Sequence, residues 1–150
     1  MKLRHLVSAS LAALTLAAAL PASAQFAKPE DAIKYRQSAL RVMGTHFGRV
    51  GAMTAGRVPY DAAAAQQNIE IATMMSTLPW QGFGAGTEGG KAKPEIWAEQ
   101  AKFKEYNEDM IKKMAALNAA AKTGNLDTLK TAFAATGGAC KTCHDAFQAK

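Results

Sequence analysis

Two cysteines and a histidine near the end of the chain form the pattern with the clearest chemistry. The stretch Cys140-Lys141-Thr142-Cys143-His144 has C-x-x-C-H spacing and holds the only two cysteines of the sequence. In c-type haem attachment, two thiols at this spacing add across the haem vinyl groups, and the following imidazole binds the iron. The competing interpretation is a redox dithiol, which would need a βαβ setting. No strand pattern surrounds the motif, so the sequence predicts one covalently attached haem c with His144 as the metal ligand.

Residues 1–24 have the pattern of an export signal. Lys2 and Arg4 precede an apolar run from Leu6 to Leu20, and Ala22-Ser23-Ala24 matches an A-x-A cleavage site. The run has fifteen residues, fewer than the roughly 20 that span a bilayer as a helix, so we expect no membrane span. We expect a cleaved signal peptide at residues 1–24, one domain at residues 25–150, and a periplasmic location, where c-type haem attachment is completed.

The charge of the chain is mildly basic. The sequence has 18 Lys and Arg against 12 Asp and Glu, a formal net charge of +6. Loss of Lys2 and Arg4 with the leader would lower this charge by two, and the haem propionates would lower it further. The basic residues are scattered rather than clustered, which argues against a nucleic-acid-binding surface.

Beyond residue 24, prolines and glycines divide the chain into four segments with helical spacing. Apolar or long side chains recur every three or four positions in each segment. The segments start at Pro29, Pro59, Pro94 and Leu126 and stop before Gly56, Pro79, Gly124 and the end of the chain. The stripe of the first segment is Ile33, Arg36, Leu40, Met43, Phe47 and Val50. No segment shows sustained period-two alternation, so the fold class is predicted to be all-α, an antiparallel four-helix bundle.

A glycine-rich loop is expected at residues 81–93. It contains Gly84-Ala85-Gly86-Thr87-Glu88-Gly89, which matches G-x-G-x-x-G letter by letter. A dinucleotide site needs a strand before this motif and a helix after it. Here a helical segment precedes it, and we interpret it as a plain loop.

Arg36 stands at a stripe position where a bundle expects an apolar side chain. Its aliphatic part could pack while its guanidinium reaches solvent at the edge of the bundle. With a haem in the bundle, a charge-assisted bond to a propionate becomes the better interpretation.

The function depends on what faces the iron opposite His144. His46 is the other histidine beyond the leader, but it lies one position off the stripe, and a surface position is favoured. The six methionines beyond the leader mostly have core spacing and are expected to pack rather than ligate. They are Met43, Met53, Met74, Met75, Met110 and Met114.

At this point the chain resembles a cytochrome c′ over the whole of residues 25–150. The resemblance rests on the following stretches: Gln25 to Pro29, Lys34 to Leu40, His46 to Arg49, Leu78 to Trp80, Gly86 to Gly90, Pro94 to Trp97 and Cys140 to Asp145. It implies a four-helix bundle, usually a homodimer, with a five-coordinate high-spin haem. Small residues around Ala39, Ala62 to Ala65 and Ala72 could allow close approach of the first two helices of each subunit.

The resemblance also implies roles for single residues. Leu40 matches the apolar residue that covers the open face of the haem. Arg36 and Gln37 match residues that contact the haem or its propionates, Trp80 and Phe83 match aromatics of the pocket, and Glu88 lies in a loop near the haem edge. One departure is Gln148, where these proteins often carry a basic residue beside the proximal face. Glutamine donates hydrogen bonds without charge.

The sequence is compatible with three functions. The leading hypothesis is a haem protein that binds small gases such as NO and CO at an open site lined by Leu40 and aromatics, and that exchanges electrons with a redox partner. The alternative is a low-spin electron carrier in which a methionine, Met43 first, supplies the sixth ligand. An enzyme is the weakest hypothesis, because no triad or carboxylate pair converges on the haem, and we expect none.

Overall fold

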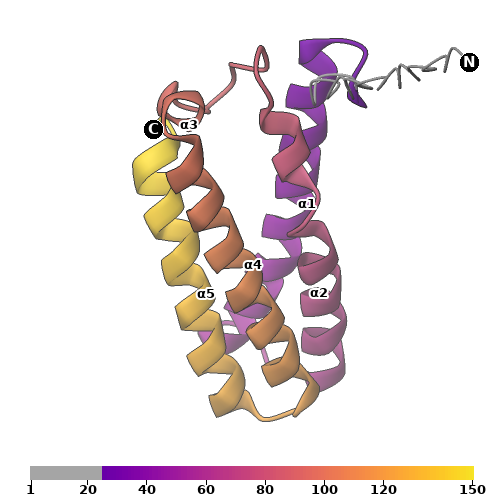
Figure 1. Ribbon diagram of the computed structural model, residues 1–150. Helices are drawn as coiled ribbons and strands as arrows, with labels where there is room; N and C mark the ends of the chain where they lie inside the picture. The colour runs from indigo at the N-terminus through magenta and orange to yellow at the C-terminus, as the bar shows by residue number, and fades with distance from the viewer. Residues whose placement is uncertain (1–24) are drawn as a thin grey trace, which may run out of the picture.

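The chain forms four long helices that run side by side (Figure 1). The computed structural model describes residues 25–150; the predicted signal peptide at 1–24 lies outside the described residues. The elements are α1 (Pro29–Thr54), α2 (Ala62–Met75), the 3₁₀ helix η2 (Pro79–Phe83), α3 (Glu95–Ala98), α4 (Gln100–Lys122) and α5 (Leu126–Phe147). The all-α fold and the four-helix bundle predicted from the sequence are confirmed.

The helix ends follow from local residues. Pro29 opens α1, where a missing amide hydrogen costs nothing. Asp61 and Asn125 cap α2 and α5 by accepting hydrogen bonds from the backbone N–H three residues further on, at 3.0 and 2.9 Å. Gly56 and Gly124, at φ +68° and +69°, turn the chain after α1 and α4 in the left-handed conformation that favours glycine. These boundaries agree with the prediction.

The third predicted helix is interrupted. The sequence predicts one helix from Pro94, but the structure has the short α3, a break at Glu99 with φ −117° and ψ +47°, and then α4. In α3, Ile96 is buried and the indole N–H of Trp97 donates to the carbonyl of Gly84 at 2.9 Å. These tertiary contacts bind α3 to the preceding loop, so it does not continue into α4.

The buried face of α1 is rotated from the predicted stripe. The buried residues are Ala32, Arg36, Ala39 and Val50. Leu40, Met43 and Phe47, which the stripe placed in the core, are half-buried. The alanines let α1 approach its neighbours closely, whereas the larger side chains occupy a second face, from which Phe47 stacks on Phe133 of α5 with ring centroids 4.1 Å apart.

The small-residue faces of α1 and α2 lie inside the subunit. Ala39, Ala65 and Ala72 are buried, and Ala65 and Ala72 belong to the main core cluster with residues of α1, α4 and α5. Ala39, Ala65 and Ala72 therefore do not provide a surface for a second subunit, whereas for Ala62 to Ala64, which are not fully buried, that role stays a prediction. The small size of the three buried alanines serves helix packing within one chain.

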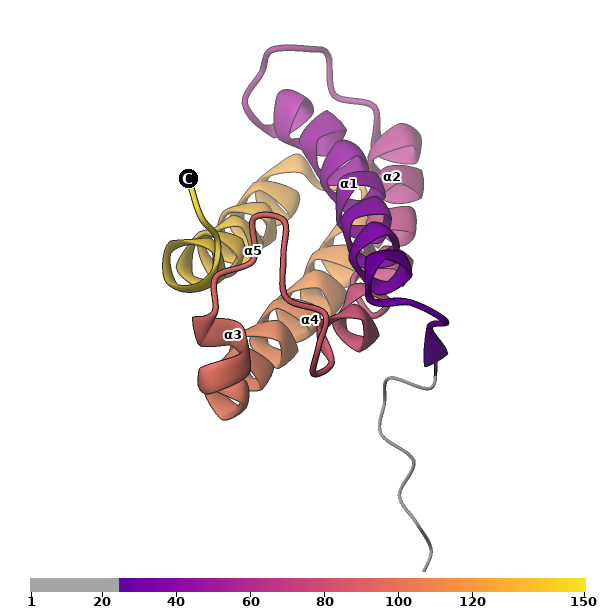
Figure 2. The ribbon, with the colours of Figure 1, turned by 90° about the horizontal axis from the view of Figure 1, so that it is seen from above.

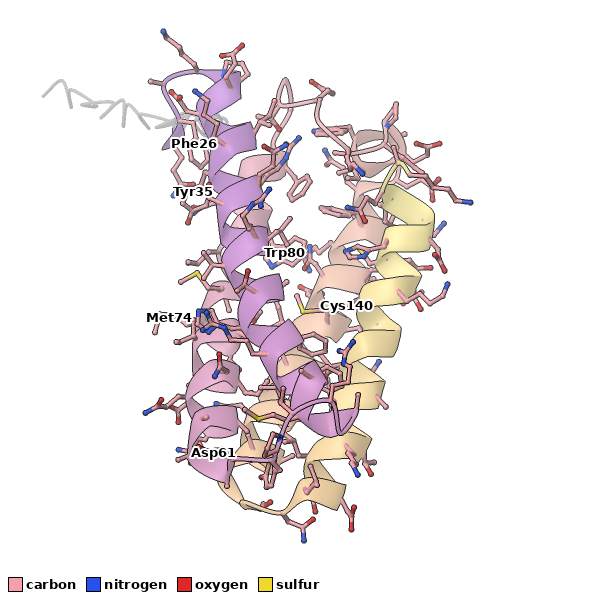
Figure 3. All side chains as sticks on the ribbon, turned by 180° about the vertical axis from the view of Figure 1, so that it is seen from behind. Phe26, Tyr35, Asp61, Met74, Trp80 and Cys140 are labelled. Carbon is pink, nitrogen blue, oxygen red and sulfur yellow. The ribbon has the colours of Figure 1, made fainter. Side chains whose placement is uncertain are left out.

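The helices α1 and α5 are in close contact at one end only. Near the end of α1, a Cβ built on Gly51 would lie 2.9 Å from the Phe133 ring. Toward the other end of the bundle the two helices diverge (Figure 1), and the side chains of Cys140 and Trp80 lie between them (Figure 3). At that end η2 and the residues after it pass over the bundle (Figure 2). None of the helices within residues 25–150 is long and apolar enough to cross a membrane.

The contact between η2 and α1 generates a first prediction. A Cβ on Gly82 would lie 2.8 Å from the Ala32 carbonyl oxygen and 2.9 Å from the Arg36 Cβ, so η2 would have to move. We expect Gly82→Ala to lower the free energy of unfolding by about 1–3 kcal/mol, measured by urea denaturation. Gly84→Ala is the matched control, because nothing lies within 4 Å of its Cβ and its φ is −66°. A loss of stability in both variants would contradict the close approach.

Candidate functional site

The C-x-x-C-H motif occupies the last two turns of α5. Both cysteines are free thiols and half-buried. Cys140 packs against the main core cluster, whereas Cys143 packs against a second cluster formed by Ile96, Phe103 and Phe147. His144 lies one turn after Cys140, so these two side chains share a face of the helix, and the imidazole is exposed. The two thiols therefore face the interior where α1 and α5 diverge.

Burial controls the protonation of these thiols. It raises the pKa of Cys140, and it raises the pKa of Cys143 to about 11, with the neighbouring Cys140 adding to the effect. An apolar environment of this kind suits residues that line a hydrophobic site.

Aromatic side chains form one wall of this interior. Phe83 of η2 lies 6.1 Å from Trp80, 6.4 Å from Trp97 and 4.9 Å from Phe103, measured between ring centroids. Phe103 in turn packs edge-on against Phe147 at 5.3 Å. Each such pair contributes about 0.5–1.5 kcal/mol beyond its buried area. The structure thus brings the predicted residues Trp80 and Phe83 together beside Cys143.

Arg36 is the polar centre of the site. Its side chain is 2% exposed, and its Nη1 donates to the carbonyl oxygens of Gly82 and Thr87 at 2.6 and 2.7 Å and to the Thr87 hydroxyl at 3.1 Å. Its Nη2 donates to the Gly89 carbonyl at 3.0 Å. Arg36 therefore binds residues 82–89 to α1, a role that the propionate interpretation did not foresee. A contact with a propionate stays a prediction.

The guanidinium also lies over aromatic rings. Its central carbon is 4.5 Å from the centroid of Phe83 and 5.5 Å from that of Trp97. Burial lowers the pKa of Arg36, and the carboxylate of Glu88 acts in the opposite direction. The stacked geometry and the backbone acceptors hold the cation where the aromatic wall begins.

The other predicted site residues lie around Arg36. Leu40 is one turn further along α1 and half-buried, and Gln37 is exposed. The Gln37 amide nitrogen Nε2 lies against Gly90: a Cβ built on Gly90 would be 2.7 Å from it. Glu88 is exposed and accepts a hydrogen bond from the Gly86 amide at 3.3 Å. The structure thus places Leu40 one turn from Arg36 and leaves Gln37 and Glu88 at the outer edge.

Two alternative iron ligands have other partners. The Nδ1 of His46 forms a hydrogen bond with Oδ1 of Asn68 in α2 at 2.8 Å, so this imidazole contacts α2 as a partly buried side chain. Met43 packs against the main core cluster. The packing of Met43 agrees with the core role that the sequence favoured, whereas His46 is partly buried rather than at the expected surface position.

The G-x-G-x-x-G match lies in a loop. A 3₁₀ helix precedes it and the short α3 follows it. Gly86 and Gly89 have φ of +80° and +137°, and the Thr87 hydroxyl donates to the carbonyl of Gly84 at 2.7 Å. The prediction of a plain loop is confirmed.

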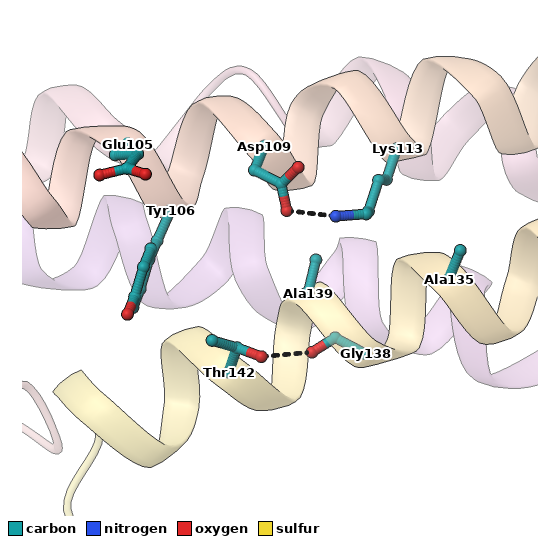
Figure 4. Close-up of a pocket in the computed structure, with 8 residues that line it drawn as sticks. All are labelled: Glu105, Tyr106, Asp109, Lys113, Ala135, Gly138, Ala139 and Thr142. Carbon is teal, nitrogen blue, oxygen red and sulfur yellow. Dashed lines mark hydrogen bonds and ion pairs between the residues drawn. The ribbon is translucent and has the colours of Figure 1, made fainter.

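A cavity of about 340 Å³ lies elsewhere, between α4 and α5 (Figure 4). Tyr106, Asp109 and Lys113 line it from α4, and Ala139 and Thr142 line it from α5. None of the predicted site residues contributes to its wall. It is separate from the interior that the cysteines face.

Known proteins match this chain over nearly all of the described residues. The family profile described as Cytochrome C' matches residues 31–148. The cytochrome c′ of Alcaligenes xylosoxydans xylosoxydans is 52% identical over 126 residues, which cover 84% of this chain and 99% of the relative. That of Rubrivivax gelatinosus is 46% identical over 129 residues, which cover 84% and 100%. The chain belongs to the cytochrome c′ family.

Solved cytochromes c′ have the same fold. The nitric oxide complex of a leucine-to-alanine variant of the Alcaligenes xylosoxidans protein matches with a TM-score of 0.80 at 50% identity, covering 83% of this chain and 98% of that one. A ferrous arginine-to-lysine variant with bound nitric oxide matches equally well at 51% identity, with the same coverage. The family resemblance expected from the sequence is confirmed.

The residues present fit the cofactor of a cytochrome c′. Within residues 25–150 two free thiols lie three positions apart on α5, an imidazole follows directly, and large apolar side chains surround the thiols. A porphyrin needs apolar walls, and its iron takes an imidazole nitrogen. The cofactor is haem c.

Sequence reasoning missed the residues that hold the site together. Thr87 is buried, and its carbonyl and hydroxyl both accept from Arg36. Gly82 supplies another acceptor and must be glycine to lie on α1. Trp97 joins α3 to the loop. The one signal in the sequence was Arg36 itself, a charged residue at an apolar stripe position.

Replacing Arg36 with lysine should weaken the site sharply. An ammonium cannot reproduce the planar fork, and each buried carbonyl left without its donor costs about 1–3 kcal/mol. We expect Arg36→Lys to lower the free energy of unfolding of the haem-loaded protein by about 2–4 kcal/mol in urea. Arg41→Lys, at an exposed position of α1, should change it by less than about 0.5 kcal/mol. Equal effects in the two variants would show that Arg36 does not hold the loop.

Proposed function

We propose that this chain is a periplasmic haem c protein whose iron is five-coordinate and high-spin and binds small gases such as NO and CO. The haem supplies an iron that binds diatomic molecules and changes oxidation state. The observation that carries the proposal is the pairing of His46 with Asn68, which directs the second imidazole beyond the leader to α2. Because His46 is bonded to Asn68, it would not bind the iron. The side of the iron opposite His144 would then face the apolar face of α1 that carries Leu40.

Particular side chains would hold the cofactor. Cys140 and Cys143 would form the thioether bonds, and His144 would be the axial ligand. Trp80 and Phe83 would form the wall of the pocket, since both rings pack beside the cysteines.

Polar residues would hold the propionate edge. Arg36 already donates from Nη1 and once from Nη2 to the loop, so its Nε–H and the second N–H of Nη2 are the donors left for a propionate. Gln37 and Glu88 lie near it at the exposed edge.

Leu40 would control access to the iron. Leu40 lies two turns before Phe47 on the same face of α1, and Phe47 is fixed by stacking on Phe133 of α5. A branched apolar side chain there cannot ligate iron and donates no hydrogen bond to a bound gas. It favours NO and CO over O₂, which needs such a donor.

The electron-carrier alternative depends on Met43 as a sixth ligand. Its packing against the main core cluster favours the open site instead. Electron exchange with a redox partner protein belongs to the proposal as a property of the same haem, and a catalytic role does not.

Export is part of the proposal. Residues 1–24 would be removed as a signal peptide, leaving the domain of residues 25–150 in the periplasm. Haem attachment to a C-x-x-C-H motif agrees with export, because the thioether bonds of such cytochromes are completed outside the bacterial cytoplasm.

Truncating Leu40 should open the iron. In the wild type, the ferrous absorption spectrum should be high-spin and shift on addition of CO. Leu40→Ala should accelerate CO association at least about tenfold, which corresponds to about 1.4 kcal/mol off the barrier. Leu40→Met should move the spectrum toward low spin. Leu117→Ala is the control, because Leu117 is fully buried in α4, and should lose about 2–5 kcal/mol of stability without faster CO binding.

Two outcomes would contradict the open site. A low-spin spectrum of the ferrous wild type would mean that the iron has a sixth ligand and would favour the electron-carrier alternative. Unchanged CO association in Leu40→Ala, flash-photolysed under the same conditions as the wild type, would remove Leu40 from the gas pathway.

A homodimer through α1 and α2 is also proposed. Within residues 25–150 the exposed large apolar side chains are Val42, Val58, Ile71 and Met74, and all lie on α1, α2 or the turn between them. Met74 is 65% exposed and projects outward from α2 (Figure 3). Because these side chains lie on neighbouring elements, we take them as the centre of the proposed interface; contiguous exposed apolar surface marks interaction sites.

Sedimentation velocity at micromolar concentration tests this dimer. The wild type should sediment as a dimer, and Met74→Asp should sediment as a monomer because a carboxylate would be buried in the interface. Ala115→Asp, at an exposed position of α4, should remain a dimer. A wild type that sediments only as a monomer would overturn the assignment.

A further inference from the structure

Lys93 caps the end of the helix that carries His144. Its Nζ donates to the carbonyl oxygens of Asp145 and Ala146 at 3.0 and 3.3 Å. Carbonyls in the last turn of a helix have no amide partner within the helix, and they form the negative end of its dipole. The Lys93 ammonium therefore satisfies two of these carbonyls. It places a positive charge at the carbonyls of the two residues that follow His144 in the chain.

The backbone on either side of this contact is paired as well. The Lys93 amide donates to the Phe147 carbonyl at 3.0 Å, and the Ala149 amide donates to the Lys91 carbonyl at 2.9 Å. The two segments run antiparallel. Lys93 thus provides donors for three carbonyls in the last turn of α5, two from its side chain and one from its backbone.

No basic residue within the last turn of α5 is available to neutralise the negative end of its dipole. Its one basic side chain is His144, and an imidazole that ligates a metal is neutral. Gln148, where related proteins often carry a basic residue, ends the helix with its amide bound to the His144 carbonyl at 3.0 Å. Lys102 lies 5.8 Å from the centroid of the Phe147 ring, but it pairs with Glu99 at 2.9 Å. Lys93 is the cation that bonds to the helix end itself.

The same segment is fixed at its other end by Arg36. The Gly89 carbonyl accepts from Arg36 Nη2 at 3.0 Å, four residues before Lys93. Residues 82–93 therefore connect α1, which carries Leu40, with the turn of α5 that carries His144. Because Arg36 and the aromatic wall fix the backbone of residues 82–93, the position of Lys93 relative to α5 is fixed as well.

We propose that Lys93 is a positioning residue for the axial histidine. The inference rests on the proposed function, in which His144 ligates the iron. By holding the carbonyls that follow His144, Lys93 keeps the last turn helical and fixes the orientation of the imidazole. Its charge favours the ferrous over the ferric iron, because the ferric state has one more positive charge.

The test compares Lys93→Met, Lys93→Arg and the control Lys91→Met in the haem-loaded protein. Lys91 is exposed, and only its backbone carbonyl takes part in the pairing. Resonance Raman spectra of the ferrous proteins report the iron–histidine stretching band, redox titration reports the potential, and amide hydrogen exchange reports the order of the last turn.

We expect only Lys93→Met to depart from the wild type. Its iron–histidine band should broaden and fall in frequency, its reduction potential should fall, and the Gln148 amide should exchange roughly tenfold faster. Lys93→Arg should restore the band and the potential, because a guanidinium keeps the charge and the donors. Lys91→Met should match the wild type in all three measurements.

Each contrary result has a distinct meaning. Faster exchange in Lys93→Met with an unchanged band and potential would show a purely structural cap and overturn the positioning role. Equal changes in Lys91→Met would attribute the effect to general surface charge and overturn it as well. A wild type without a five-coordinate iron–histidine band would instead contradict the proposed function, and the potential of Lys93→Met against Lys91→Met would then decide the Lys93 inference.

Discussion

The buried guanidinium of Arg36 is the interaction on which the open end of the bundle depends. A charge removed from water is costly unless its donors are satisfied. Here the acceptors are the carbonyls of Gly82, Thr87 and Gly89, which can converge on one side chain only if the backbone between them takes one conformation. That conformation places Phe83 against the guanidinium. A polar side chain thus orders an apolar wall.

The first helix has two apolar faces that differ in burial. Ala32 and Ala39 are buried and let α1 lie close to its neighbours. The larger Leu40, Met43 and Phe47 occupy the other face and remain half-buried. Hydrophobic periodicity predicts a helix from both sets, but it does not predict which apolar side chains are fully buried and which are half-buried, because both sets are apolar. Met43 and Phe47 of the half-buried set still pack against the main core cluster.

Sequence reasoning succeeded where the determinants are local. Asp61, Asn125 and the glycines after α1 and α4 fix helix ends within a few residues, and the C-x-x-C-H motif is complete in five. It failed where the determinants are distant. The break at Glu99 follows contacts of α3, including a bond from Trp97 to a carbonyl thirteen residues earlier. The acceptors of Arg36 lie 46 to 53 residues away, so only the misplaced charge was visible, not its partners.

The two ends of the bundle are therefore held together by different interactions. At the far end, α1 and α5 meet through apolar contact, with Phe47 stacked on Phe133 and no room for a side chain at Gly51. At the end with the motif, hydrogen bonds to backbone carbonyls replace that contact, from Arg36 on α1 and from Lys93 to α5. Such bonds fix the geometry of the backbone at this end of the bundle. A bundle closed by apolar packing at both ends would hold the same four helices but leave no walls for a flat cofactor. In the proposed function, this polar closure would hold the thiols, the imidazole and Leu40 in place around the haem.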